Sequence, residues 1–174
     1  MTYLPDVPAE VGKRGIVSNT ATPATALRTL GVASDTYGPT INSGRSPRYV
    51  EVLGRALAES LRPSNSETLV VWNTPDDAVL AHAVALQLGV TVRRASEVGG
   101  ILTLDEPIAR GTRVALVATE WDGRWLETLR RLVLGSGGAL VAAAAVVGSD
   151  VLDSVADRAT IALLPSHEAK EFVR

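Results

Sequence analysis

Residues 68–90 read TLVVWNTPDDAVLAHAVALQLGV, and this stretch decides the fold class. Its first five residues form a β-type run without alternation, which is typical of a strand buried on both faces. The strand breaks at 73–75, where Thr74 can cap a helix over residues 75–88 that ends before Gly89. Because this helix is apolar nearly all round, we expect it to be sandwiched between other elements.

The same order of elements recurs along the rest of the chain. Apolar residues at helical spacing predict two more helices, over 48–61 and 124–134. The remaining strands are predicted over residues 90–94, 113–118, 139–147 and 160–164. Alternating strands and helices of this kind predict an α/β fold, in which a parallel sheet of about five strands carries helices on both faces. We expect residues 38–174 to form this domain, and residues 1–37 to form an N-terminal arm or cap with a short helix over 23–30.

The composition argues against several classes of function. With 17 basic and 19 acidic side chains, the net charge of −2 gives no broad attraction to nucleic acid or to anionic lipid. The longest apolar run, residues 139–147, is shorter than the roughly 20 residues that a membrane-spanning helix needs. Cysteine is absent and the first ten residues lack a secretory signal pattern, so we expect a cytoplasmic protein. The two lysines, Lys13 and Lys170, lie near the termini, which leaves almost no lysine for catalysis.

Several motifs follow one another in the order found in one enzyme family. Residues 40–49 read TINSGRSPRY before a long helix, residues 70–75 read VVWNTP before an Ala/Leu-rich helix, residues 99–102 read GGIL, and residues 111–117 read GTRVALV. Over roughly residues 38–148 the chain resembles the type I phosphoribosyltransferases, and among them the orotate phosphoribosyltransferase branch. The resemblance implies a phosphoribosyltransferase-like sheet, a ligand cleft at the carboxyl ends of its strands, and pairing of two copies.

The chain departs from this family in the loops that handle anions. The family signature has two acidic residues that engage the ribose, followed by a Thr/Gly-rich loop that cradles the 5′-phosphate. Here the acidic pair becomes AT at 118–119, and the loop at 120–124 reads EWDGR. Residues 76–77 are both Asp where the family tends to place small or basic residues, and the counterpart of the mobile catalytic loop has no lysine. Compared with the family pattern, the loops at 76–77 and 118–124 carry more negative charge or bulkier side chains.

The resemblance also indicates which residues line the ligand cleft. The candidates are Asn73, Thr74, Asp76, Asp77, Arg94, Thr119, Glu120, Trp121, Asp122, Gly123 and Arg124, with Arg45 and Tyr49 on the side of the base. Four of them are carboxylates. One hypothesis is therefore that the former anion site takes a divalent cation such as Mg²⁺, an amine or a hydroxyl-rich neutral ligand, with Glu120 and Asp122 as candidate metal ligands. No residue is assigned a catalytic role.

Each of these residues also has a structural interpretation. The acids at 76–77 complement the dipole of the helix that they begin, and Asp122 can cap the following helix. Trp121 is either a ring that stacks on a ligand or a plug in a vacated phosphate site, and the plug is favoured. Tyr49 fits the inner stripe of its helix. His82 is interpreted as a core or interface histidine.

Two functions remain as alternatives. The first is a phosphoribosyltransferase-like protein that has lost ordinary phosphoribosyl transfer and serves as an assembly module or binds a small nucleotide-like or cationic ligand. The second is an active phosphoribosyltransferase, of the glycosyltransferase class, that uses phosphoribosyl diphosphate with orotate or another base through a remodelled loop. A homodimer is expected because members of the resembled family commonly pair and because the helix over 48–61 offers an apolar face. We expect no nucleic-acid or membrane partner.

Overall fold

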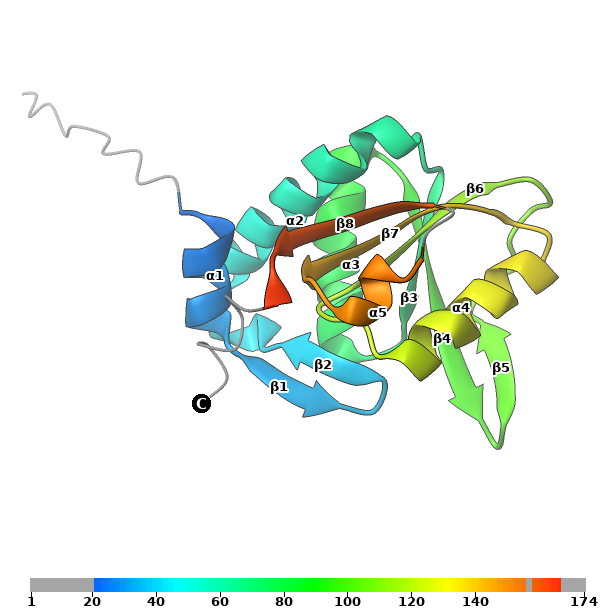
Figure 1. Ribbon diagram of the computed structural model, residues 1–174, viewed down its shortest axis with the longest axis horizontal. Coiled ribbons are helices and arrows are strands. Elements are labelled where there is room, and N and C mark those ends of the chain that lie inside the picture. The colour runs from blue at the N-terminus through cyan, green and yellow to red at the C-terminus, as the bar shows by residue number, and fades with distance from the viewer. Residues whose placement is uncertain (1–20, 156–157, 167–174) are drawn as a thin grey trace, which may run out of the picture.

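The central sheet has six strands in the order β5-β4-β3-β6-β7-β8 (Figure 1). It is seen in a computed structural model that describes residues 21–155 and 158–166. Neighbouring strands run parallel, except that β5 runs antiparallel to β4 at one edge. The predicted α/β class and parallel sheet are confirmed, with one strand more than expected. The strands are β3 (Thr68–Trp72), β4 (Thr91–Val98), β5 (Ile101–Leu104), β6 (Arg113–Ala118), β7 (Ala139–Val147) and β8 (Ala159–Leu164).

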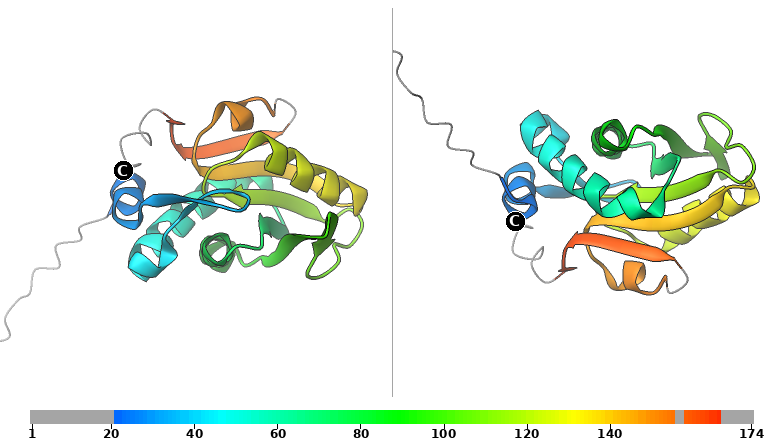
Figure 2. Two further views of the ribbon diagram at one scale, coloured as in Figure 1. Left: turned by 90° about the horizontal axis from the view of Figure 1, so that it is seen from below. Right: turned by 90° about the horizontal axis from the view of Figure 1, so that it is seen from above.

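Helices cover both faces of the sheet, as predicted (Figure 2). The helices are α1 (Pro23–Leu30), α2 (Pro47–Leu61), α3 (Pro75–Leu88), α4 (Gly123–Gly135) and α5 (Asp150–Asp153). α1, α2 and α3 pack on one face, whereas α4 and α5 pack on the other. Successive side chains of β3 enter the two clusters alternately: Leu69 and Val71 lie on the α1–α3 side, and Val70 and Trp72 on the α4 side. Each described helix is too short or too polar to cross a lipid bilayer.

The ends of α3 show why the stretch around it could be predicted closely. The side chain of Thr74 accepts a hydrogen bond from the N–H of Asp77 at 3.1 Å, and Pro75 occupies the first helical position. Gly89 ends the helix with a φ of 71°, in the left-handed region that glycine adopts most readily. The predicted bounds of β3 and α3 are confirmed.

β4 and β5 form an antiparallel hairpin at one edge of the sheet. The strand predicted over 90–94 continues as β4 to Val98, and β5 returns beside it from Ile101. Gly99 and Gly100 form the two-residue turn, with φ values of 60° and 79°. Positive φ at both turn residues matches the twist of the hairpin and requires residues such as glycine.

The outer side of α3 has no covering element in the described part of the chain, so the prediction of a sandwiched helix was wrong. α3 packs against α2 and β3 on its inner side. Val79 is 44% exposed and Leu86 is 70% exposed. His82 is also exposed, so it is not a core histidine, and the other alternative, an interface histidine, stays a prediction.

The apolar face of α2 is buried inside the chain. Val50, Leu53, Leu57 and Leu61 all belong to the cluster that α2 shares with α1, α3 and the sheet. This face is therefore not available to a second copy, so of the two reasons for expecting a homodimer only the resemblance to the family is left.

The N-terminal part of the described chain packs onto this same cluster. α1 has the bounds predicted for it, and its Leu27 and Leu30 are fully buried. Two short strands, β1 (Val32–Asp35) and β2 (Gly38–Ile41), then form an antiparallel hairpin that is separate from the six-stranded sheet. The 3-10 turns η1 (Ser43–Arg45) and η2 (Arg62–Ser64) flank α2.

Candidate functional site

The strand order changes direction between β3 and β6. From β3 the chain moves outward to β4 on one side, whereas β6, β7 and β8 follow one another on the other side. In open sheets of this type, ligands bind at the carboxyl ends of the strands that flank such a switch point. Residues 73–77 follow β3 and residues 119–124 follow β6, so the structure brings two of the predicted loops to this point.

Residues 37–43, called the covering segment below, lie across the switch point. The backbone N–H of Ile41 donates to the side-chain oxygen of Thr119 at 3.1 Å, in a buried position. The backbone N–H and the hydroxyl of Ser43 donate to Asp76 Oδ1 at 2.9 and 2.5 Å. The covering segment thus forms hydrogen bonds with both predicted loops.

Gly38 gives the covering segment its closest approach to the loop after β6. A Cβ atom on Gly38 would lie 3.5 Å from the carbonyl oxygen of Glu120 and 3.8 Å from the Cβ of Asp122. Gly38 has a φ of 130°, which L side chains rarely adopt. Glycine is therefore suited to this position by its conformation as well as by its size.

Asp77 is a buried carboxyl group at this edge of the sheet. The hydroxyl of Thr74 donates to its Oδ2 at 3.0 Å, while Oδ1 is buried and has no hydrogen-bond partner among the described residues. Burial raises the pKa of Asp77 to about 7, against the lowering effect of hydrogen bonds from Thr74 and the Thr119 backbone. The carboxylates of Asp35 and Asp76 raise this pKa further. A large fraction of Asp77 is therefore neutral at neutral pH.

Trp121 belongs to the core on the α4 side of the sheet. Its side chain is 3% exposed, and its indole N–H donates to the carbonyl of Ala144 in β7 at 3.1 Å. The hydroxyl of Ser149 donates to the Trp121 carbonyl at 3.3 Å. In this position the indole ring serves packing and is not presented to a ligand.

The residues that follow Trp121 begin α4. The Asp122 side chain accepts a hydrogen bond from the N–H of Arg124 at 3.0 Å and so caps the helix, as one of the interpretations predicted. Gly123 is the first helical residue. The guanidinium carbon of Arg124 lies 4.5 Å from the ring centre of Trp125, a cation–π geometry. Glu120 is half-buried.

Two predicted cleft residues hold neighbouring strands and loops together. The side-chain amide of Asn73 donates to the hydroxyl of Ser96 in β4 at 3.1 Å. Both the backbone and the guanidinium of Arg94 donate to the carboxylate of Asp105 at 2.9 Å. Although partial burial raises the pKa of Asp105, these hydrogen bonds outweigh it and hold the pKa below its usual value.

The two residues assigned to the base side make different contacts. Arg45 lies beside the end of α1, where a Cβ atom on Gly31 would come within 2.8 Å of an Arg45 nitrogen. Tyr49 is half-buried and packs against the cluster of α1, α2 and α3.

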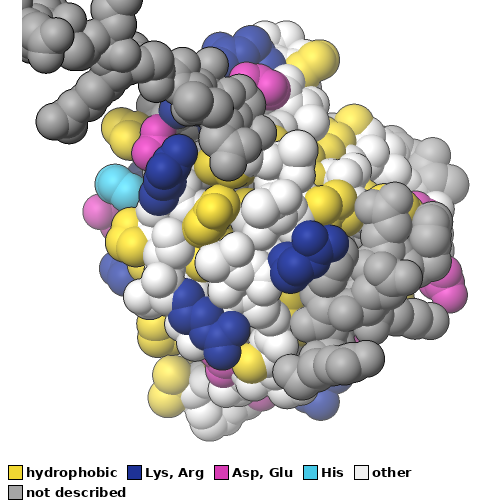
Figure 3. All heavy atoms as spheres, turned by 90° about the vertical axis from the view of Figure 1, so that its left-hand side faces the viewer, with side chains coloured by type: hydrophobic (Ala, Val, Ile, Leu, Met, Phe, Trp, Pro, Cys, Tyr) yellow, Lys and Arg dark blue, Asp and Glu magenta, His cyan; other side chains and the backbone are white. Residues whose placement is uncertain are grey.

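The carboxylates of the predicted site can be compared with the ligand clusters that hold metal ions in proteins. Among the residues that the structure describes, no group of three or more Asp, Glu or His side chains is placed to hold an ion. Figure 3 faces the side where α1 and the β1–β2 hairpin lie. Outside the grey atoms it shows separate basic side chains and a few acidic ones, without a continuous acidic area. The Mg²⁺ hypothesis, with Glu120 and Asp122 as candidate ligands, stays a prediction; one oxygen of the Asp122 carboxylate already accepts the cap hydrogen bond of α4.

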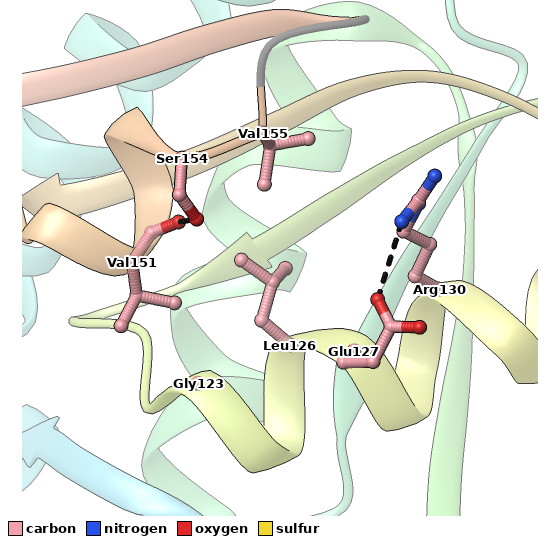
Figure 4. Close-up of a pocket in the computed structure, with 7 residues that line it drawn as sticks. All are labelled: Gly123, Leu126, Glu127, Arg130, Val151, Ser154 and Val155. Atoms are coloured by element: carbon pink, nitrogen blue, oxygen red, sulfur yellow. Dashed lines mark hydrogen bonds and ion pairs between the residues drawn. The ribbon is translucent and has the colours of Figure 1, made fainter.

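A cavity of about 230 Å³ lies between α4 and α5 (Figure 4). It shares Gly123 with the predicted site. Its polar side chains are engaged within the cavity wall, because Glu127 pairs with Arg130 at 3.2 Å and the hydroxyl of Ser154 donates to the Val151 carbonyl at 2.7 Å. The cavity is lined by Gly123, Leu126, Glu127, Arg130, Val151, Ser154 and Val155.

Sequence reasoning missed an aromatic cluster at the end of β3. Tyr37, the second turn residue of the β1–β2 hairpin, stacks on Trp72 with ring centres 4.1 Å apart and planes 12° apart. Trp125 of α4 meets both rings edge-on, at 4.9 Å from Tyr37 and 5.1 Å from Trp72. The signal in the sequence was an aromatic residue beside Gly38 in a stretch typical of a turn.

Solved structures that are similar to this chain include several phosphoribosyltransferases. A phosphoribosyltransferase from Corynebacterium diphtheriae matches with a TM-score of 0.69 and 18% identity, over 87% of this chain and 98% of that chain. Orotate phosphoribosyltransferase from Mycobacterium tuberculosis, in complex with inorganic phosphate, matches with a TM-score of 0.65 and 17% identity over the same shares. Adenine phosphoribosyltransferase from Thermoanaerobacter pseudethanolicus matches with a TM-score of 0.62 and 12% identity, over 79% of this chain and 95% of that chain.

Two further comparisons, both made on the sequence, found no relative. No protein-family model matches the chain, and no curated protein sequence matches it. The structural matches span nearly the whole length of the proteins concerned and include both orotate and adenine enzymes. They establish a phosphoribosyltransferase-like fold for this chain.

Proposed function

We propose that this chain uses a phosphoribosyltransferase-like fold without ordinary phosphoribosyl transfer, and that it serves as a small-ligand-binding or assembly module. The observation that carries the proposal is the Asp122 carboxylate on the first turn of α4. In the family that the sequence resembles, the loop at this position cradles the 5′-phosphate with backbone N–H groups and a helix N-terminus. Here the N–H of Arg124 already donates to a carboxylate of the chain itself.

Electrostatic repulsion from the Asp122 carboxylate also disfavours a phosphate at this position. Like charges at contact distance repel by about 4 kcal/mol near a protein surface, and Arg124 offsets this only in part because its guanidinium lies over Trp125. The first turn of α3 carries the Asp76 carboxylate beside Asp77, which is in large part neutral, so the second helix N-terminus at the switch point also has a negative charge. Both helix ends that face a phosphoribosyl donor in this fold therefore disfavour an anion.

The covering segment supports the same proposal. It holds Thr119 and Asp76 in hydrogen bonds with Ile41 and Ser43, at the positions where a donor's ribose and pyrophosphate are expected from the resemblance. A sugar that used these groups would have to replace contacts that the chain already makes.

A donor assay tests the proposal. Radiolabelled phosphoribosyl diphosphate is offered with orotate, adenine and other bases, with Mg²⁺ present and an active orotate phosphoribosyltransferase as positive control. We expect no transfer and no calorimetric heat with the donor alone. Transfer that is abolished by Asp122→Ala or Arg124→Ala would overturn the proposal in favour of an active enzyme with a remodelled loop.

The assembly part of the proposal is a homodimer that uses α3. Val79 and Leu86 are exposed apolar side chains on the same side of this helix, and α2 is already covered. Leu86→Glu is expected to shift the sedimentation coefficient from dimer to monomer, whereas Ser60→Glu on the exposed side of α2 leaves it unchanged. A wild-type protein that sediments as a monomer at all concentrations contradicts this part. A cytoplasmic location stays a prediction.

A further inference from the structure

We propose that the covering segment, residues 37–43, is a pH-controlled lid on the switch point, which is closed while Asp77 carries a proton and opens when Asp77 ionises. The proposal deepens the ligand-binding role proposed above, because the lid controls access to the same two loops. It rests on that role only for the small molecule that enters, since the closed and open states can be measured without a ligand.

Asp77 and the covering segment are joined through their neighbours. The backbone N–H of Ile41 donates to the side-chain oxygen of Thr119 at 3.1 Å, and the Thr119 backbone in turn hydrogen-bonds to the carboxyl group of Asp77. Asp76, next to Asp77 in the chain, accepts a hydrogen bond from the N–H of Ser43 at 2.9 Å. Both anchors of the covering segment are therefore held by residues that adjoin Asp77 or bind to it.

The surroundings of Asp77 suit a neutral carboxyl group better than a charged one. Its side chain is 5% exposed. Oδ2 accepts a hydrogen bond from the hydroxyl of Thr74 at 3.0 Å, whereas Oδ1 is buried and has no hydrogen-bond partner among the described residues. A buried carboxylate oxygen without a donor is unfavourable. Ionisation of Asp77 therefore favours a state in which water reaches Oδ1.

Two further carboxylates face Asp77, and one of them lies on the β1–β2 hairpin. Asp35 is the last residue of β1, and Asp76 lies in the first turn of α3. Burial is the main cause that raises the pKa of Asp77 to about 7, and the charges of Asp35 and Asp76 raise it further. If Asp77 ionised in the closed state, three like charges would repel one another. Movement of the hairpin relieves this repulsion, because it carries Asp35 away.

The hairpin can move while the central sheet stays intact. β1 and β2 pair only with each other and are separate from the six-stranded sheet. Opening breaks the hydrogen bonds of Ile41 and Ser43 and the stack of Tyr37 on Trp72. It breaks no strand pairing of the central sheet. The hydroxyl of Thr119 and the first turn of α3 then become accessible at the switch point.

The sign of the pH dependence follows from the two states of Asp77. In the open state the carboxyl group is hydrated, so its pKa returns toward the ordinary value of 3.8. The advantage of the closed state is therefore complete below about pH 4 and is lost as the pH rises to about 7. Within this window the ratio of open to closed chains rises by up to about tenfold per pH unit, and above it the ratio levels off.

Amide hydrogen exchange measured by NMR tests the lid. The protection factors of the Ile41 and Ser43 amides are measured at pH 5, 6, 7 and 8, which removes the intrinsic dependence of exchange on pH. The measurement is repeated in low concentrations of urea. Local opening exposes little surface and responds weakly to urea, whereas amides of β3 and β6 that exchange by global unfolding respond strongly.

Three variants assign the effect to Asp77. Asp77→Asn removes the titration and keeps a neutral side chain of the same shape. Asp35→Asn removes the carboxylate that the hairpin contributes. Glu59→Gln, on the exposed side of the last turns of α2, is the matched control, since it removes one negative charge away from the switch point.

In the wild-type chain we expect the protection of both amides to fall at least tenfold from pH 5 to pH 7 and less than about threefold from pH 7 to pH 8, with little response to urea. Asp77→Asn is expected to keep the high protection at every pH. Asp35→Asn should level off at a lower pH with a smaller total fall, because it lowers the pKa of Asp77. Glu59→Gln should behave like the wild-type chain.

Three results overturn the lid. They are protection that does not change from pH 5 to pH 8, an equal fall in Asp77→Asn, and exchange of both amides only by global unfolding. If Asp77→Asn does not fold, Asp35→Asn carries the test, and a fall equal to that of the wild-type chain overturns the proposal.

The exchange experiment contains neither donor nor ligand, so it is independent of the proposed function. Phosphoribosyl transfer in the donor assay overturns the loss of activity and leaves the lid to be judged by exchange. A failure of the lid in the exchange experiment leaves the proposed loss of transfer in place.

Discussion

Gly54 of α2 lies so close to Ala83 of α3 that a Cβ atom on Gly54 would be 2.5 Å from the Cβ of Ala83. The next nearest atoms are the backbone carbonyl carbon of Ala83, at 2.9 Å, and the backbone nitrogen of Val84, at 3.2 Å. These are backbone atoms that cannot turn away as a flexible side chain does. The distance between the two helices is therefore set by the missing side chain at Gly54.

Gly54→Ala is expected to lower the free energy of unfolding by about 1–3 kcal/mol, because α2 and α3 must move apart to admit the methyl group. Gly135→Ala is the matched control, since nothing lies within 4 Å of a Cβ atom at the last residue of α4. Urea unfolding at 25 °C measures both. Equal stability of the two variants would show that the α2–α3 contact tolerates the methyl group.

Asp77 predicts a pH dependence of stability. Its pKa is raised to about 7 in the folded chain, so between about pH 4 and pH 7 the folded state keeps a proton that the unfolded state has released. The free energy of unfolding therefore falls as the pH rises through this window, by up to about 1.4 kcal/mol per pH unit from this group. Below and above the window the slope from Asp77 vanishes. Asp77→Asn is expected to remove this dependence of the free energy of unfolding on pH. Unfolding curves measured from pH 4 to pH 8 check this.

Asp105 provides a control of opposite sign. Its pKa is lowered by its hydrogen bonds to Arg94, so its contribution to stability is present above the unfolded pKa and is lost as the pH falls. Asp105→Asn should therefore weaken the acid-induced loss of stability. A pH slope that survives Asp77→Asn unchanged contradicts the assignment to Asp77.

The cap on α4 can be separated from any role of its charge. Asp122→Ala removes the acceptor for the Arg124 N–H and is expected to cost about 1 kcal/mol of stability. Asp122→Asn keeps a side-chain oxygen at the helix end, so it should retain most of the stability while losing the negative charge. Thermal unfolding of the two variants checks this. If Asn is as harmful as Ala, the carboxylate does more than accept this hydrogen bond.

Trp121→Phe is expected to lower the free energy of unfolding by about 1–3 kcal/mol, because it deletes the indole N–H that donates to Ala144 and leaves unfilled volume. Guanidinium unfolding is the measurement. A Phe variant as stable as the wild-type chain would mean that the indole is not held by the core, and would favour a ring available to ligands.

The fold could be predicted from the sequence wherever local signals agreed. Thr74, Pro75 and Gly89 mark the ends of α3 by cap chemistry, and the apolar run before them marks β3. β5 was missed because residues 101–104 pair with β4 across the Gly99–Gly100 turn, and alternation over four residues is a weak signal. The pairing of β5 depends on the residues of β4 as well as on its own, so residues 101–104 alone do not predict it.

The candidate site was predicted only in part. The loops after β3 and β6 meet as expected, because the rule for switch points depends on strand order alone. The contact of Tyr37 with Trp72 and Trp125 joins a turn, a strand end and a helix that are far apart in the sequence, and no local pattern encodes it. The exposed side of α3 was missed for a related reason: composition shows that a helix is apolar, but not which neighbours cover it.

The covering segment also has a consequence for the order in which the chain folds. Ile41 and Thr119 are 78 positions apart, so the partner that holds β2 is made long after β2 itself. Contacts of such long range form late, since a large loop must close before they contribute. During synthesis the hydrogen bond between Ile41 and Thr119 must wait until β6 has been made, whereas the contact of Tyr37 with Trp72 becomes available earlier.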